Sequence, residues 1–76
     1  MTASNLRDLL VNMLTRDVGG DRRRWRIAVG DVRVYSRATH PHCNWAVAPS
    51  GSNREIAEVE RLVDDLRARH PIVAAG

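Results

Sequence analysis

Residues 25–35 contain the feature that most constrains the fold of this chain. In two runs, 25–29 and 32–35, large apolar side chains alternate with other residues around a Gly30-Asp31 pair. Glycine at the first central position suits a type II′ turn, because that position has a positive φ. The register set by such a turn places the apolar residues of both runs on one face. The pattern therefore predicts a β-hairpin whose apolar face consists of Trp25, Ile27, Val29, Val32 and Val34.

Helical periodicity lies on both sides of this hairpin. Leucine and methionine recur every three or four residues over 5–17, after a candidate N-cap at Ser4 and before a glycine pair, which predicts an amphipathic helix. Further along, Ser52 and Glu55 have the spacing of a capping box. The apolar positions that follow predict a second helix that ends by His70, where a proline comes next.

The remaining segment completes the predicted architecture. Residues 36–42 have the composition of a loop, and alternation over 43–48 predicts a third strand. The sequence thus predicts an α+β fold of order α-β-β-β-α, in which a three-stranded antiparallel meander carries both helices on one face. Because typical domains have ~100–150 residues, we expect a single domain over 1–76, with 1–3 and 73–76 frayed.

The basic charge is concentrated in the predicted hairpin. All twelve basic residues are arginine, and the net charge is +3. Half of these arginines lie in residues 22–37, which contain a single acidic residue. In the predicted pleat, the face opposite the apolar one gathers the candidate binding residues, which are Arg24, Arg26, Arg33, Tyr35 and Arg37.

Two kinds of partner suit such a face. Arginine and tyrosine are enriched at protein interfaces, and Ala28, Ala46 and Ala48 would leave room for close approach. The first hypothesis is therefore an interaction module that associates with another protein or with its own copy as a homodimer. The alternative is binding of the RNA or DNA phosphate backbone, with Tyr35 or the plane of an arginine guanidinium stacking on a base. A third interpretation is a solvated face, on which arginine stems cover the strands.

The predicted element order resembles that of the double-stranded-RNA-binding domain, which implies binding of duplex RNA. In that family a lysine-rich start of the last helix contacts phosphate. Here residues 52–58 contain one arginine, Arg54, and two glutamates, Glu55 and Glu58. These carboxylates would repel an anionic backbone, so we leave the chain outside that family.

Catalytic and metal chemistry have little support in the sequence. His40, His42 and Cys43 carry zinc-ligand side chains, so metal binding in this loop is a less favoured alternative. Their spacing matches no zinc motif, and the chain has no other cysteine. We expect Cys43 to be a small buried apolar residue, with no metal or cofactor bound. No nucleophile elbow, phosphate loop or EF-hand loop is present, which argues against an enzyme. No apolar run approaches the ~20 residues of a membrane span, so a cytoplasmic location is expected.

Overall fold

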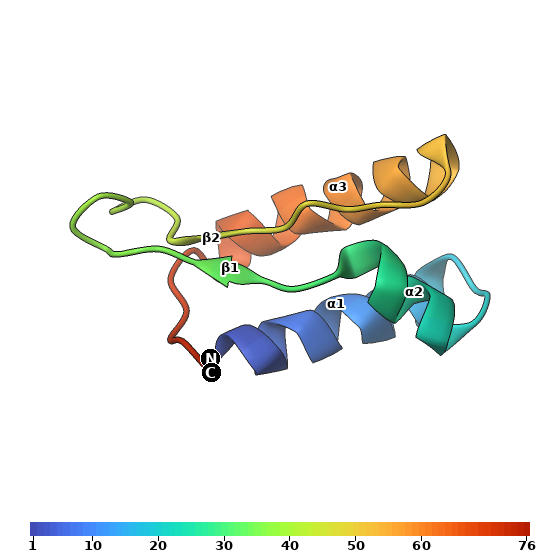
Figure 1. Ribbon diagram of the computed structural model, residues 1–76, viewed down its shortest axis with the longest axis horizontal. Coiled ribbons are helices and arrows are strands. Elements are labelled where there is room, and N and C mark those ends of the chain that lie inside the picture. The colour runs from blue at the N-terminus through green and yellow to red at the C-terminus, as the bar shows by residue number, and fades with distance from the viewer.

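The computed structural model of this protein describes residues 1–76 and contains three helices and two short strands. In chain order these elements are α1 (Ala3–Asp17), α2 (Arg22–Val29), β1 (Arg33–Val34), β2 (Trp45–Ala46) and α3 (Asn53–Arg69). α1 and α3 run in opposite directions along the long axis of a molecule that measures 37 × 20 × 18 Å (Figure 1). α2 and the strand pair lie together on one side of these two helices. No helix combines the length and the apolar character that a membrane span requires.

One apolar core joins the helices and strands. The inward faces of α1 and α3 supply most of its side chains, and α2, β2 and the C-terminal segment close it. Each large side chain that is fully buried contributes ~1.5–3 kcal/mol before the cost of ordering is subtracted. The largest side chains that are fully buried are Leu6, Leu10, Leu14, Leu66, Val11, Val29 and Val59.

The first predicted helix is confirmed as α1. It begins at Ala3, two residues earlier than expected, because Thr2 is the N-cap and its side chain accepts a hydrogen bond from the Asn5 amide at 3.1 Å. The helix ends at Asp17, and the glycine pair that follows it has φ values of 92° and 95°. Only glycine adopts this region readily, so the predicted end of the helix is also confirmed.

The predicted hairpin is wrong, because its first strand is a helix. Residues 22–29 form α2, and Gly30 ends this helix with φ 66° instead of forming a hairpin turn. Trp25 and Val29 point into the core as expected, but Ile27 is 57% exposed. The face on which the sequence placed Trp25, Ile27 and Val29 together therefore does not exist.

The apolar residues of this segment fit both the spacing of a strand and the spacing of a helix, and the structure adopts the helix. Trp25, Ala28 and Val29 have the i, i+3, i+4 spacing of one helix face, and all three are buried. Asp21 caps the helix by accepting from the Arg23 amide at 3.0 Å. The Trp25 indole donates to the Gly19 carbonyl at 2.7 Å, which closes the α1–α2 connection. A helix also pairs its backbone groups within one segment, whereas a strand would need a partner.

The predicted three-stranded meander is replaced by a two-stranded antiparallel sheet. Arg33 pairs with Ala46, and Val34 pairs with Trp45. The strand expected at 43–48 shortens to two residues, and its partner comes from the segment expected as the second strand of the hairpin. With residues 22–29 in a helix, β1 has a neighbour on one side only, so no third strand forms.

The second predicted helix is confirmed as α3. Ser52 is its N-cap and both hydrogen bonds of the capping box are present, with the Glu55 amide donating to Ser52 Oγ at 3.1 Å. The helix ends at Arg69, before the C-cap residue His70. Val59, Leu62, Val63 and Leu66 form its buried face.

The two ends of the chain, which the sequence predicted to fray, are hydrogen-bonded to each other. Thr2 and Ala74 form a parallel bridge, and the amide of Ala3 donates to the Ala74 carbonyl at 2.8 Å. The amide and the hydroxyl of Ser4 both donate to the Gly76 carbonyl, at 2.7 and 2.5 Å. The last residues thus accept hydrogen bonds from amides in the first turn of α1, which have no partner within the helix.

Candidate functional site

The structure distributes the five predicted site residues over three segments. Arg24 and Arg26 lie on α2, Arg33 lies on β1, and Tyr35 and Arg37 follow β1 in the connection to β2. Because the predicted hairpin is absent, these residues do not share one face of a sheet. The arginines that remain free of carboxylates form a different surface.

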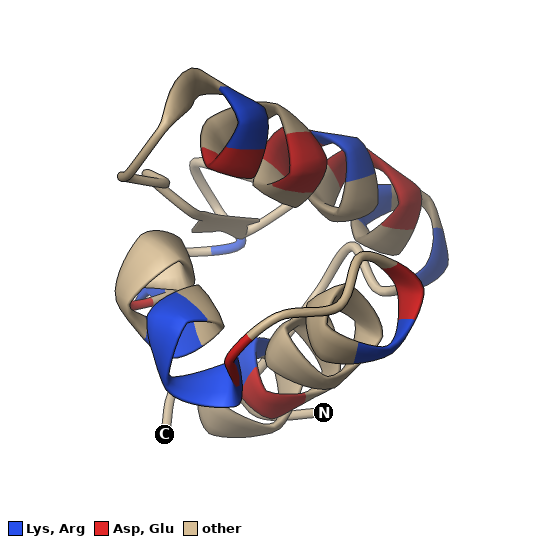
Figure 2. Cartoon of the chain, turned by 90° about the vertical axis from the view of Figure 1, so that its right-hand side faces the viewer, with Lys and Arg blue, Asp and Glu red and all other residues tan.

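Ion pairing separates the arginines into two groups. Five of the twelve form ion pairs within the chain, and three of these five, Arg61, Arg67 and Arg69, pair with acidic residues one turn away on α3. α3 therefore neutralises its own guanidinium groups. In Figure 2, α3 alternates between basic and acidic residues, whereas α2 carries basic residues only. The arginines without an ion pair are Arg7, Arg22, Arg23, Arg26, Arg33, Arg37 and Arg54.

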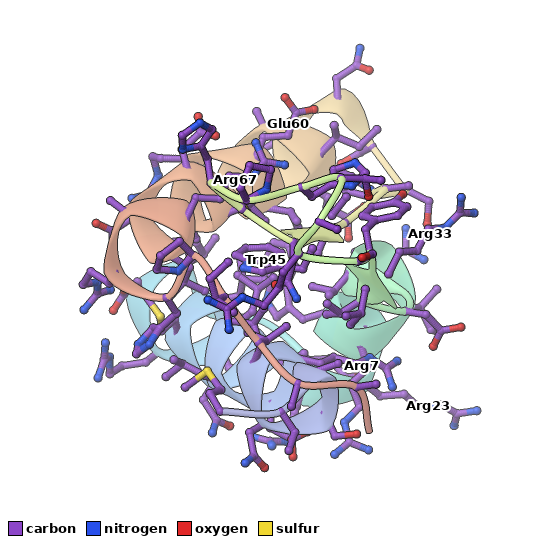
Figure 3. The ribbon with its side chains drawn as sticks, turned by 90° about the vertical axis from the view of Figure 1, so that its left-hand side faces the viewer. Arg7, Arg23, Arg33, Trp45, Glu60 and Arg67 are labelled. Carbon is purple, nitrogen blue, oxygen red and sulfur yellow. The ribbon has the colours of Figure 1, made fainter.

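Four of these unpaired residues form an exposed basic region on α2 and β1. We call Arg22, Arg23, Arg26 and Arg33 the arginine surface; all four are exposed. Figure 3 shows Arg23 and Arg33 pointing outward on the same side of the molecule. Arg22, Arg23 and Arg26, together with Asp21, line an open hollow of about 550 Å³ that contains no apolar residue. Such a surface presents several guanidinium groups to one extended anion.

The position of these arginines costs helix stability. Two of them, Arg22 and Arg23, occupy the first turn of α2, where no acidic residue is present, and the positive end of the helix dipole disfavours positive charge there. Asp21 at the N-cap offsets part of this repulsion. Arg22 is held by a hydrogen bond to the Asn12 side chain on α1, a neutral partner that leaves its charge uncompensated. An anion bound at this end would relieve the repulsion.

Two contacts fix the orientation of α2. At its C-terminal end, Arg7 of α1 donates to the Arg26 carbonyl at 3.1 Å, which suits the negative end of the helix dipole. At its N-terminal end, Arg24 donates to both carboxylate oxygens of Glu55, at 2.8 and 3.0 Å. This bidentate pair joins α2 to the first turn of α3. Arg24 therefore helps to position α2, a role that the sequence did not predict.

Glu55 connects three features at the start of α3. Its carboxylate also accepts from the Ser52 amide at 2.9 Å, as part of the capping box. Gly51 lies against it with φ +116°, and a Cβ at that position would meet Glu55 Oε1 at 2.7 Å. The hydrogen bond from Arg24, together with the Ser52 amide, lowers the pKa of Glu55 from 4.5 to about 2.

This pKa predicts a specific acid sensitivity. Because the folded-state pKa lies below the unfolded value, the Glu55 carboxylate stabilises the fold at pH values above about 4.5 and loses that contribution between about 4.5 and 2. We expect the thermal midpoint of the protein, followed by circular dichroism, to fall through this window. The thermal midpoint of the Glu55→Gln variant should fall less over the same pH window. Glu60→Gln, which changes an exposed α3 residue without an ion pair, should keep the wild-type profile; equal profiles for all three proteins would contradict the assignment.

The candidate metal ligands do not converge. No group of three or more His, Cys, Asp or Glu side chains is arranged to hold a metal ion. The His40 ring stacks on Tyr35, and its Nδ1 lies 2.9 Å from Thr39 Oγ1. Cys43 is half-buried, and its Sγ donates to the Trp45 carbonyl at 3.5 Å.

Sequence reasoning missed the roles of four residues in this region. Arg22 and Arg23 lay outside the predicted alternation, although their membership of the arginine-rich segment 22–37 was visible in the sequence. The contact of Arg7 with the Arg26 carbonyl joins residues 19 positions apart, and no local pattern signals it. The Tyr35–His40 stack likewise depends on the path of a loop.

No protein-family model, no curated protein and no solved structure matches this chain.

Proposed function

We propose that this protein binds nucleic acid through the phosphate backbone, using the arginine surface on α2 and β1. The observation that carries the proposal is the separation of the arginines: α3 neutralises its own, while Arg22, Arg23, Arg26 and Arg33 are exposed without a carboxylate partner. Guanidinium groups bind phosphate with bidentate geometry. Neutralisation of several phosphates by one basic surface supplies most of the affinity in sequence-independent binding.

The chemistry of the hollow supports this choice of partner. Its lining by Asp21 and three arginines contains no apolar side chain, whereas the centre of a protein interface is largely apolar and rich in aromatic residues. Protein association was favoured by the sequence partly because Ala28 was expected on the outer face. Ala28 is only 2% exposed in the structure, so that support is gone.

The expected behaviour of a charge variant tests the proposal. We expect Arg23→Gln/Arg26→Gln to weaken binding of a fluorescent 20-nucleotide oligonucleotide by about tenfold for each lost phosphate contact at 0.1 M salt, measured by fluorescence anisotropy. The slope of log K against log salt should also decrease, by about 0.7–0.9 for each contact. Glutamine keeps good helix propensity, so α2 should persist.

A matched control changes the same amount of charge elsewhere. Arg61→Gln/Arg69→Gln removes two arginines that are already paired with acids on α3. It lowers the net charge equally, but we expect much smaller changes in affinity and in the salt slope. An equal loss of affinity in both double variants would show that binding depends on net charge alone, which would contradict the assignment of binding to the arginine surface. No binding by the wild-type protein at 50 mM salt would reject the proposal.

Self-association remains a second candidate because of one exposed apolar residue. Around the axis of α2, Ile27 lies between Arg23 and Arg24, and it is 57% exposed. A large apolar side chain surrounded by arginines resembles the centre and rim of a small interface. Sedimentation at several concentrations distinguishes the two candidates, since a monomer at every concentration would remove this one.

A further inference from the structure

The loop between β1 and β2 carries a preformed pair of stacked rings. The centroids of Tyr35 and His40 are 4.5 Å apart, and their planes differ by 20°. Tyr35 is 38% exposed and His40 is also exposed. In Figure 1 this loop extends beyond the ends of α1 and α3. The ring pair is therefore accessible to a partner.

Hydrogen bonds hold the pair in place. The Tyr35 amide donates to the Asn44 carbonyl at 2.7 Å, which continues the pairing of β1 with β2. The amides of Thr39 and His40 both donate to the Ser36 carbonyl, at 3.2 and 2.8 Å, and this turn returns the imidazole to the tyrosine ring. The rings are thus ordered before any partner arrives, which reduces the entropy that binding must lose.

The ring pair adjoins the arginine surface. Arg33 precedes Tyr35 by two residues, and side chains two apart in an extended strand leave the backbone on the same side, ~6.6 Å apart. Arg33 is exposed and has no ion pair, so a positive charge lies next to an aromatic platform. Proteins that bind single strands combine these two features, a basic path for the backbone and aromatic rings on which bases stack.

On the basis of the proposed function, we propose that the partner is single-stranded nucleic acid, and that one of its unpaired bases stacks on the Tyr35–His40 pair. A duplex keeps its bases stacked inside the helix, where such a platform cannot reach them. Phosphates of the same strand then contact Arg33 and the arginines of α2. The proposal thus assigns base stacking to the loop and backbone contact to the arginine surface.

The test uses three probes on the full chain: a 12-nucleotide strand, the same strand with abasic sites throughout, and the corresponding 12-base-pair duplex. We expect the wild-type protein to bind the normal strand most tightly at 0.1 M salt. Tyr35→Leu should weaken binding of the normal strand by about five- to 150-fold, the range for loss of one base–aromatic stack. It should leave the affinities for the abasic strand and the duplex unchanged, because those probes use phosphate contacts only.

Two further variants keep the test decisive. Tyr35→Phe retains the aromatic ring, so its affinity for the normal strand should stay close to that of the wild type. His40→Ala removes the second ring of the pair and should weaken binding of the normal strand, as Tyr35→Leu does. His40→Ala changes an exposed loop residue, so it remains informative even if Tyr35→Leu does not fold. Equal affinity of the wild-type protein for the normal and abasic strands would overturn the stacking proposal while leaving the arginine surface intact. Failure to bind all three probes would reject both.

Discussion

Replacing Asn44 with alanine is expected to lower the free energy of unfolding by about 1–3 kcal/mol for each buried backbone group that loses its partner. Asn44 is the one buried polar residue, 3% exposed. Its Nδ2 donates to the Val73 carbonyl at 2.8 Å, and its Oδ1 accepts from the Val73 amide at 2.9 Å. Alanine leaves both groups of Val73 unpaired in a buried position, so two such losses are expected together.

The consequences should extend along the C-terminal segment. Val73 belongs to the core, and the residues after it supply the carbonyls that accept from the amides of Ala3 and Ser4. Weakening of this segment should therefore also expose the start of α1. Hydrogen exchange should become faster at the Val73 amide in the variant.

Thermal unfolding followed by circular dichroism measures the effect. For a domain of 60–100 residues, each kcal/mol lowers the midpoint by about 4–8 °C. Asn53→Ala is a matched control, because Asn53 is exposed at the first residue of α3 and should change stability by less than about 0.5 kcal/mol. A midpoint for Asn44→Ala as high as that of this control would contradict the role of Asn44.

Replacing Trp45 with alanine is expected to cost about 3–5 kcal/mol, the usual range for removal of a large aromatic residue from a core. Trp45 is 2% exposed, and it packs in the single core of the chain. Its Nε1 donates to the His70 carbonyl at 2.8 Å, which attaches the end of α3 to β2. The Arg67 guanidinium lies 5.7 Å from the ring centroid, in cation–π range.

The size of this loss matters because the chain is small. A domain of this length has a total stability of roughly 4–11 kcal/mol, so Trp45→Ala should leave a large unfolded fraction. Trp45→Phe keeps most of the packing and loses the hydrogen bond, so its cost should be intermediate. Urea unfolding measures both. Ile27→Ala is the control, since Ile27 is mostly exposed; a Trp45→Ala cost as small as that of Ile27→Ala would contradict the assignment.

Local patterns predicted α1 and α3 well, because the information for each lies within the segment. Leu6, Leu10 and Leu14 repeat at helical spacing, and Ser52 with Glu55 satisfies the N-terminal groups of α3 locally. Neither prediction needs knowledge of what the helix packs against. The boundaries agree to within two residues for the same reason.

The predicted hairpin failed where two periods fit the same residues. Trp25 and Val29 are compatible with alternation and with a helical i, i+4 step, and only their surroundings decide between them. α1 offers the Gly19 carbonyl to the Trp25 indole, and the core accepts Ala28 along with Trp25 and Val29. These contacts favour the helix, and the sheet loses a strand as a result.

The candidate site shows the same division between local and tertiary information. The concentration of arginine in residues 22–37 was evident from the sequence, as was the candidacy of Arg26, Arg33 and Tyr35. Whether an arginine is free depends on distant acids: Arg24 is paired with Glu55, 31 residues away. The loop geometry that brings His40 onto Tyr35 is equally invisible in the sequence.

Sequence alone predicts two amphipathic helices, with their ends placed to within two residues, and a basic segment between them. Helical periodicity, caps and net charge are properties of neighbouring residues, so they can be read from one segment. Only the tertiary structure decided that residues 22–29 form a helix and which arginines remain unpaired. These outcomes depend on burial and on Coulombic partners that come from elsewhere in the chain, and folding alone brings those partners within reach.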